Sequence, residues 1–200
     1  NDVAFYTSGE TMIEVLLEAI AGAKHHIHIQ FYIFEADEVG KKVCEALMKK
    51  AREGVEVRVL YDDVGSWKLP NEWVEELRGA GIETRAFLKV RFPRFTGKVN
   101  YRNHRKVVVV DGRIGFVGGM NIASRYLKGV KWGIWKDLHM KIEGKGVYGL
   151  QTSFLTDWYA ADRSLITSSA YFPEMESKGS VMLQVATSDP IGEWRDIMQG

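Results

Sequence analysis

Several patterns that define special classes of protein are scarce or missing from this sequence. A single cysteine, Cys44, rules out a disulfide framework and any metal site built from several thiolates, and it fits a reducing compartment. No apolar run approaches the roughly 18 residues of a membrane span, and no signal-peptide pattern opens the chain. The net charge of only +1 argues against a surface built throughout for nucleic acid. We therefore expect a soluble globular piece, whatever the intact protein is.

The residues that are present predict one α/β domain. With 200 residues, 46% of them apolar and 26% charged, the chain can bury a sizeable core. Amphipathic helical segments alternate with short apolar runs, which is typical of a layered α/β/α domain with a mixed, largely parallel sheet. The expected helices cover residues 8–24, 39–54, 70–81 and 147–165, and the expected strands cover 25–35, 55–63, 82–87, 107–110, 113–117, 132–144 and 182–188.

A basic segment over residues 89–106 interrupts this alternation. KVRFPRFTGKVNYRNHRK contains seven Lys or Arg, three aromatic residues and no acid. Such a segment is either a solvated loop or a loop that faces an anionic partner, such as phospholipid headgroups or a nucleic-acid backbone. Because it leads directly into a histidine motif, we weight the two interpretations equally. The residues that would contact a membrane or substrate are Arg91, Arg94, Lys98 and Arg102.

The stretch NHRKVVVVDGRIGFVGGMN carries the candidate chemistry. His104 and Lys106 are two residues apart, so on an extended chain their side chains share a face. The valines of residues 107–110 bury the strand that follows, and Asp111-Gly112 predicts a two-residue hairpin turn. The chain then returns as a partner strand, which brings the residues after it back beside His104.

A set of groups suited to binding phosphate follows the hairpin. Gly118-Gly119 allows the backbone to approach a ligand closely, and the Asn121 amide can donate to an oxyanion. Together with the imidazole of His104 and the cation of Lys106, these groups suit phosphoryl transfer without a metal or another cofactor. In that chemistry the histidine attacks phosphorus, while lysine and asparagine hold the non-bridging oxygens.

These residues resemble the HKD signature of the phospholipase D superfamily. The pattern is His104-x-Lys106-x4-Asp111 followed by Gly-Gly-Met-Asn121, and the flanking NYRNHRK, GGMNIASRY and WKDLHMKIEG are similar to bacterial cardiolipin synthases in particular. The resemblance implies a phospholipase D/nuclease-like fold in which two HKD motifs meet across a pseudo-twofold axis. One histidine becomes phosphorylated, and the other protonates the leaving alcohol. It also implies that Asp137 orients a catalytic histidine. Asp111 is either part of the catalytic set or a structural turn residue.

A second HKD motif is missing from the sequence. His139 begins a His-x-Lys pair, but Gly146 stands where the aspartate should be, so we interpret His139 and Lys141 as the exposed face of an ordinary strand. The chain then corresponds to the N-terminal half of a two-motif enzyme, with a first HKD domain over residues 1–188. Residues 189–200 are interpreted as the truncated start of a second repeat, since LQVATSDPIGEWRDIM echoes VAFYTSGETMIEVL. We expect this half to be inactive without a second HKD motif from the same chain or a second copy.

Two other clusters of ionisable residues are weighed as metal sites. His26 and His28 share a strand face, but without a third ligand an ordinary strand surface is the better interpretation. Asp62-Asp63 could bind Mg²⁺, yet acids at a strand end before glycine and serine are usually turn residues. We therefore assign no metal site.

The resemblance predicts a phosphatidyl transferase as the leading function. One phosphatidylglycerol would phosphatidylate His104, and a second would displace it to yield cardiolipin and glycerol. The expected partners are phosphatidylglycerol or another phospholipid and a membrane surface, with the catalytic domain facing the cytoplasm at the inner membrane. Nucleic acid is not an expected partner. Two alternatives remain open: a phospholipase D-type phosphodiesterase or nuclease, and a non-catalytic domain that binds phospholipid headgroups.

Overall fold

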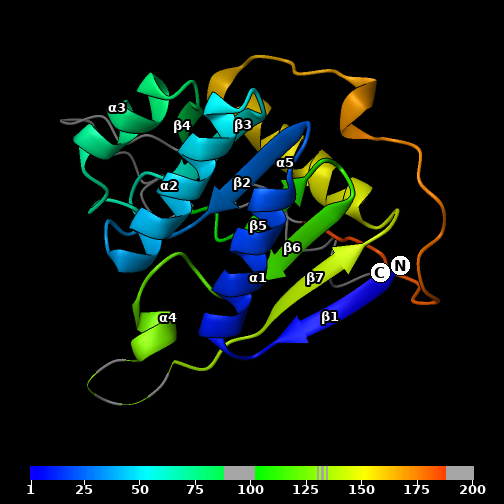
Figure 1. Cartoon of the computed structure of the whole chain (residues 1–200), viewed down its shortest axis with the longest axis horizontal. Coiled ribbons are helices and arrows are strands. Elements are labelled where there is room, and N and C mark those ends of the chain that lie inside the picture. The colour runs from blue at the N-terminus through cyan, green and yellow to red at the C-terminus, as the bar shows by residue number, and fades with distance from the viewer. Residues whose placement is uncertain (88–101, 130, 132, 134, 188–200) are drawn as a thin grey trace.

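The computed structural model describes residues 1–87, 102–129, 131, 133 and 135–187. In these residues seven strands form one sheet in the order β1-β7-β6-β5-β2-β3-β4 (Figure 1). The strands are β1 Asp2–Tyr6, β2 His26–Phe31, β3 Glu56–Asp62, β4 Glu83–Phe87, β5 Val107–Val110, β6 Ile114–Gly118 and β7 His139–Glu143. The helices are α1 Gly9–Gly22, α2 Glu38–Arg52, α3 Asn71–Gly79, α4 Arg125–Lys128, α5 Val147–Asp162 and the 3₁₀ helix η2 Ser169–Tyr171.

The sheet is mixed, as predicted, but its parallel part is the smaller one. β2, β3 and β4 are parallel, because α2 and α3 each carry the chain back before the next strand begins. β1, β7, β6 and β5 pair antiparallel in that order, and β5 is also antiparallel to β2. The expectation of a largely parallel sheet is therefore corrected. It assumed that helices and strands alternate along the whole chain, but in the second half a tight turn joins β5 to β6 and makes them antiparallel.

Helices cover both faces of the sheet, which confirms the predicted α/β/α layering (Figure 1). On one face, α1 and α2 pack against a cluster that includes Ile27 and Ile29 of β2 and Val108 of β5, all fully buried. On the other face, Leu150 of α5 packs with Val107 of β5. Neighbouring valines of β5 therefore enter opposite layers, as the two-residue period of a strand requires. In the described part of the chain, no helix is both long and apolar enough to cross a bilayer.

The last expected strand is not present in the described residues. Residues 182–187 form no strand there, although Leu183 and Val185 pack half-buried beside α5. This segment does not extend the sheet beyond β1, since Leu183 and Val185 turn to the layer of α5, and it is tied to the sheet edge by a hydrogen bond from the Val181 N–H to the Asn1 carbonyl at 3.2 Å. The second repeat predicted over residues 189–200 lies outside the described residues.

The strand expected over residues 132–144 is shorter in the structure, where β7 begins at His139. Just before it, the Asp137 carboxylate accepts a hydrogen bond from the Leu138 N–H at 2.8 Å. This local bond competes with strand pairing for the same N–H, so the ladder starts only at the next residue.

Candidate active site

His104 and Lys106 lie at the carboxyl end of β2, around Tyr32. The exposed His104 ring stacks on the Tyr32 ring with centroids 3.9 Å apart and planes inclined by 19°. The Lys106 ammonium lies 5.6 Å from the centroid of the same ring and donates to the His104 carbonyl at 2.5 Å. Ligands of α/β sheets bind at the carboxyl ends of the parallel strands, which is where this cluster is placed. Sequence reasoning did not select Tyr32 as a site residue. A signal existed, because Tyr32 directly follows Phe31, the last residue of β2, and ligand sites lie at the carboxyl ends of such strands.

The electrostatic environment favours a neutral His104. Partial burial and the nearby Lys106 charge lower the pKa of His104, while Asp62 opposes that shift. Burial also lowers the pKa of Lys106, and the Asp137 charge opposes it. A neutral imidazole beside an ammonium group is the pairing that a histidine nucleophile for an anionic phosphodiester needs.

The Asn121 amide is brought to the same place by the chain after β6. Its oxygen accepts a hydrogen bond from the Ile33 N–H at 3.0 Å, directly after Tyr32, and its nitrogen donates to the Tyr126 hydroxyl at 2.8 Å. An amide nitrogen carries two hydrogens, so among the described residues one remains for an oxyanion. The structure thus gathers His104, Lys106 and Asn121 around residues 32 and 33.

The glycine pair before Asn121 makes room for protein rather than for a ligand. The Gly119 N–H donates to the Leu138 carbonyl at 2.9 Å, and a β-carbon on Gly119 would collide with the Asp137 carboxylate. A β-carbon on Gly118 would lie 2.8 Å from Cγ of His139. The prediction that Gly119 binds phosphate through close backbone approach is therefore corrected, because that N–H and that space are already used.

His139 is also placed differently from the prediction. Its side chain is fully buried, not on an exposed strand face, and it lies beside Gly118 of β6, whose missing side chain leaves room for the ring. The Lys141 side chain on the same face is about one-fifth exposed and pairs with Glu143 at 2.8 Å.

Asp137 lies near Lys106 rather than in contact with His104. Its carboxylate packs against Gly119 and is the charge that opposes the lowering of the pKa of Lys106. The acid that acts on His104 in this structure is instead Asp62, at the end of β3. A role for Asp137 in orienting His104 stays a prediction.

Asp62 and Asp157 hold the segment that carries His104, from opposite sides. Asp62 accepts from the N–H groups of Val64 and Gly65 at 3.0 and 2.8 Å, which confirms the turn interpretation, and from the Asn103 N–H at 3.4 Å. Asp157 of α5 accepts from the Asn103 side chain at 2.6 Å. The residue before His104 is therefore anchored to both the sheet and the α5 layer.

The Asp157 carboxylate is a central buried acid of this anchor. It also accepts from the Gln30 side chain at 2.7 Å and pairs with Arg105, which follows His104. Sequence reasoning missed it. A signal existed, since Asp157 lies on the same helical stripe as Leu150 and Phe154, where an acid needs buried partners.

The basic segment is described only at its end. Arg102 is nearly buried, with a guanidinium nitrogen 3.7 Å from the Asp62 carboxylate, so its predicted contact with a membrane or substrate is corrected to an inward-facing ion pair. Arg91, Arg94 and Lys98 lie outside the described residues.

Comparison with known proteins places this arrangement in a family. The profile described as "Cardiolipin synthase, PLD-like domain" matches residues 16–134, more than half of the chain. The chain belongs to this family. The resemblance of the HKD residues to the phospholipase D superfamily is thereby confirmed.

Curated members of the family match over the whole chain. The chain is 44% identical over 202 residues to the cardiolipin synthase of Oceanobacillus iheyensis and 42% identical over 203 residues to the major cardiolipin synthase ClsA of Bacillus subtilis. Each alignment covers 100% of this chain but 42% of the relative, so the chain spans about two-fifths of the length of these relatives.

A solved structure shares the fold. Nuc from Salmonella typhimurium, a phospholipase D family member, superposes with a TM-score of 0.60 at 22% identity and covers 80% of this chain and 95% of its own. At that identity the likeness supports the fold alone.

Asp111 of this PLD-like domain stabilises a turn of the fold and lies away from the candidate site. Its carboxylate accepts from the backbone N–H groups of Lys24, His25 and His26 at 2.7 to 2.9 Å, which ties the β5–β6 turn to the start of β2. β5 separates it from Lys106 by roughly 17 Å at 3.3 Å per residue. Direct catalysis by Asp111 is therefore corrected in favour of the turn interpretation. Asp111 and Gly112 both have positive φ, 54° and 64°, and the predicted turn is present, with Arg113 as a third connecting residue.

We expect Asp111→Ala to destabilise the PLD-like domain by about 3 kcal/mol, because three N–H groups lose a charged acceptor. Asp111→Asn should cost about 1 kcal/mol, because asparagine keeps one acceptor oxygen and tolerates positive φ. Urea unfolding measures both changes. Activity of the folded variants should remain within about twofold of the parent. A large fall in kcat with unchanged stability would restore Asp111 to the catalytic set.

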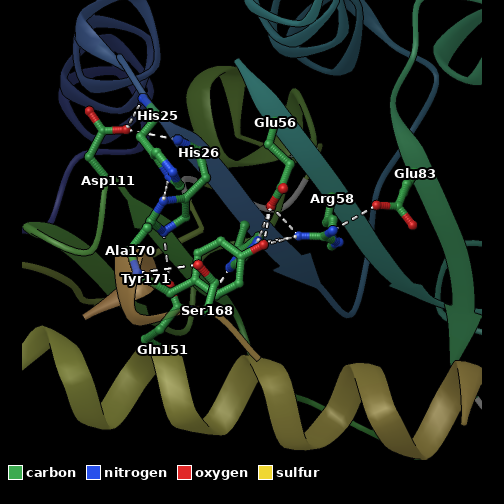
Figure 2. Close-up of polar contacts among 11 residues, drawn as sticks. His25, His26, Glu56, Arg58, Glu83, Asp111, Gln151, Ser168, Ala170 and Tyr171 are labelled. Atoms are coloured by element: carbon green, nitrogen blue, oxygen red, sulfur yellow. Dashed lines mark hydrogen bonds and ion pairs between the residues drawn. The ribbon is translucent and has the colours of Figure 1, made fainter. Parts of the chain in front are cut away.

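A buried row of polar side chains, shown in Figure 2, lies at the start of β2, whereas the site lies beyond its other end. His26 and His28 are fully buried under α5, so the prediction of an exposed strand surface is corrected. The Gln151 side chain joins them, 3.1 Å from Nε2 of His26 and 2.7 Å from Nδ1 of His28. Burial first, and then the neighbouring His28, lower the pKa of His26 to about 4. Alternation in the sequence could not show that a helix covers the polar face.

Tyr171 of η2 closes this row from the other side (Figure 2). Its hydroxyl donates to Glu56 at 2.6 Å and accepts from Arg58 at 2.9 Å, and Arg58 also pairs with Glu83 at 2.9 Å. Within the described residues, no group of three or more His, Cys, Asp or Glu side chains is arranged to hold a metal ion.

Proposed function

We propose that this chain supplies one half of the active site of a phosphatidyl transferase, which makes cardiolipin and glycerol from two molecules of phosphatidylglycerol. The observation that carries the proposal is the His104–Lys106 pair on Tyr32, in a chain similar over its whole length to cardiolipin synthases. The proposal extends from this chain to the longer protein that its relatives represent.

In the proposed first step, the neutral ring of His104 attacks the phosphorus of one phosphatidylglycerol. The bond from phosphorus to the glycerol oxygen breaks, and a phosphatidyl-histidine forms. Lys106 and the free N–H of Asn121 stabilise the charge that builds on the non-bridging oxygens. The leaving glycerol oxygen takes a proton from a general acid, because an alkoxide with a pKa of about 15 departs poorly without one.

In the second step, a hydroxyl group of a second phosphatidylglycerol attacks the phosphatidyl-histidine. That hydroxyl loses its proton to the same general acid–base group, the bond from phosphorus to His104 breaks, and cardiolipin is released. We assign the acid–base group to a second HKD half, and we assign to Asp137 the alignment of the site through its charge beside Lys106.

A membrane surface is the proposed setting of this reaction. Trp67, which is 77% exposed, follows the carboxyl end of β3, and His104 lies at the carboxyl end of the parallel strand β2. Trp135 is also exposed. Tryptophan is enriched where proteins meet the headgroup region of a bilayer. We propose that these side chains contact lipid at the cytoplasmic side of the inner membrane.

The proposal predicts that the full-length protein converts phosphatidylglycerol vesicles to cardiolipin and glycerol in equal amounts. Activity should persist in EDTA, because the nucleophile, cation and neutral donor are all side chains of the protein. Lipid mass spectrometry and a glycerol assay measure the products. Release of phosphatidic acid without cardiolipin would favour a hydrolytic phospholipase D. Cleavage of single-stranded DNA in place of lipid would favour a nuclease, and binding to vesicles without turnover would favour the headgroup-binding alternative.

A further inference from the structure

His139 is a buried side chain for which the mechanism above has no use. At the start of β7 it pairs with Tyr6 of β1 on one side and with Gly118 of β6 on the other. Directly paired residues share a face of the sheet. Because Gly118 has no side chain, and a β-carbon there would lie only 2.8 Å from Cγ of His139, the imidazole extends over the glycine.

Lys106 lies on the other side of the same glycine. The pairing of Val107 with Val117 places the next residue outward, Lys106, beside Gly118. Lys106 faces the layer of α1 and α2, since Val107 faces α5 and neighbouring strand residues alternate. His139 faces that layer too, because Met140 packs on the α5 side. The side chains of His139 and Lys106 therefore start on opposite sides of Gly118 and on the same face of the sheet.

Both partners of this pair have unused hydrogen-bonding capacity in the described part of the chain. Neither ring nitrogen of His139 has a partner there, although the side chain is fully buried. The Lys106 ammonium has three hydrogens, and it makes one described hydrogen bond, to the His104 carbonyl. Buried polar atoms without partners are rare, and each one calls for an explanation in function or bound solvent.

The charge state of His139 suits an acceptor. Burial, and then the Lys106 charge, lower the pKa of His139 to about 4, so the ring is neutral at pH 7 and has one bare nitrogen. A protonated ring beside the ammonium group would repel it, whereas a neutral ring can receive a hydrogen bond from it directly or through one water molecule.

We propose that His139 is a positioning residue for Lys106, whose imidazole supplies the hydrogen-bond acceptor that holds the ammonium group toward the phosphate site. Gly118 is the spacer that lets the two side chains meet across β6. The inference rests on the proposed function, because it assumes that Lys106 binds a phosphate group. Its test measures anion binding and does not require lipid turnover.

The test compares variants of the full-length protein by their affinity for tungstate, a phosphate mimic that probes the Lys106 site. His139→Phe fills the same space without an acceptor. We expect it to weaken tungstate binding about tenfold at pH 7, the size of one hydrogen bond to a charged group. The alkaline loss of binding, which follows deprotonation of Lys106, should begin about one pH unit lower, because the ammonium form loses its acceptor. His139→Gln restores an acceptor and should remain within about threefold of the parent.

Tyr6→Phe is the matched control, since it removes a polar atom on the other side of His139 and should change neither measurement. The melting temperature of His139→Phe is measured alongside, so that weaker binding can be separated from loss of the fold. If that variant does not fold, His139→Leu takes its place. Unchanged tungstate affinity and unchanged pH dependence in a folded apolar variant would overturn the inference. A parent protein that binds tungstate but makes no cardiolipin would instead overturn the proposed function.

Discussion

Replacing His104 by asparagine is expected to lower phosphatidyl transfer by about four orders of magnitude or more, the size of loss seen when a covalent nucleophile is removed. Asparagine keeps a polar planar group but cannot form the phosphatidyl-enzyme bond. Initial rates on phosphatidylglycerol vesicles measure the loss. The parent protein, denatured during turnover at neutral to mildly alkaline pH, should carry the phosphatidyl mass on the peptide that contains His104, because strong alkali would remove the acyl esters and acid would break the bond from phosphorus to nitrogen.

His25→Asn is the matched control, because it makes the same change at an exposed histidine at the far end of β2. Its rate should remain within about twofold of the parent. Wild-type rates in His104→Asn, or a phosphatidyl adduct on another residue, would show that His104 is not the nucleophile. Melting curves of both variants separate a chemical effect from loss of the fold.

Acidification from pH 7 to pH 5 is expected to destabilise the domain by about 4 kcal/mol, through His26 and His139 alone. The pKa of each falls from 6.5 to about 4 on folding, with burial as the first cause. Between those values the unfolded chain binds protons that the folded chain does not, so stability falls as the pH falls. The change is about 2 kcal/mol for each histidine over these two pH units. Burial also lowers the pKa of His28, which adds in the same direction.

Urea unfolding at a series of pH values, followed by tryptophan fluorescence, measures this loss. The expected change is a large part of the roughly 5–15 kcal/mol that stabilises an ordinary domain. His139→Phe removes one titrating group and should reduce the pH dependence by about 2 kcal/mol without changing its sign. Equal stability at pH 7 and pH 5 would mean that these histidines are not buried in the neutral form.

The predictions from sequence succeeded where one short segment contained all the information. The spacing of His104 and Lys106, the four valines and the Asp111 turn are local patterns, and the structure contains the strand and the hairpin that they predicted. The predictions failed where a distant segment decides the outcome. Gly118-Gly119 has the composition of a ligand loop, yet the space beside the two glycines is occupied by residues 137–139, some twenty residues later, at the start of β7 and just before it.

Burial of polar residues was the other feature that the sequence pattern could not supply. His26 and Asp157 are buried polar residues, and each finds its partner more than 50 residues away. A strand that alternates between polar and apolar residues is compatible with a polar face that is either solvated or covered. Only the packing of α5 onto β2 decides between the two, and that packing depends on the whole fold.

The hydrogen bonds of the buried row around Gln151 each have a fixed donor and acceptor, and this makes the row cooperative. The Gln151 oxygen can only accept, so His26 donates from Nε2 and must use its bare Nδ1 to receive the bond from His25. The Gln151 nitrogen can only donate, so His28 receives it at Nδ1, while Nε2 of His28 lies 3.2 Å from an Arg58 nitrogen and 3.7 Å from the Glu56 carboxylate. His26 and Gln151 are each both a donor and an acceptor in one chain, so turning the Gln151 amide would also require the histidine rings beside it to turn. The start of β2, α5 and β3 should therefore open together in hydrogen exchange, as a single unit rather than strand by strand.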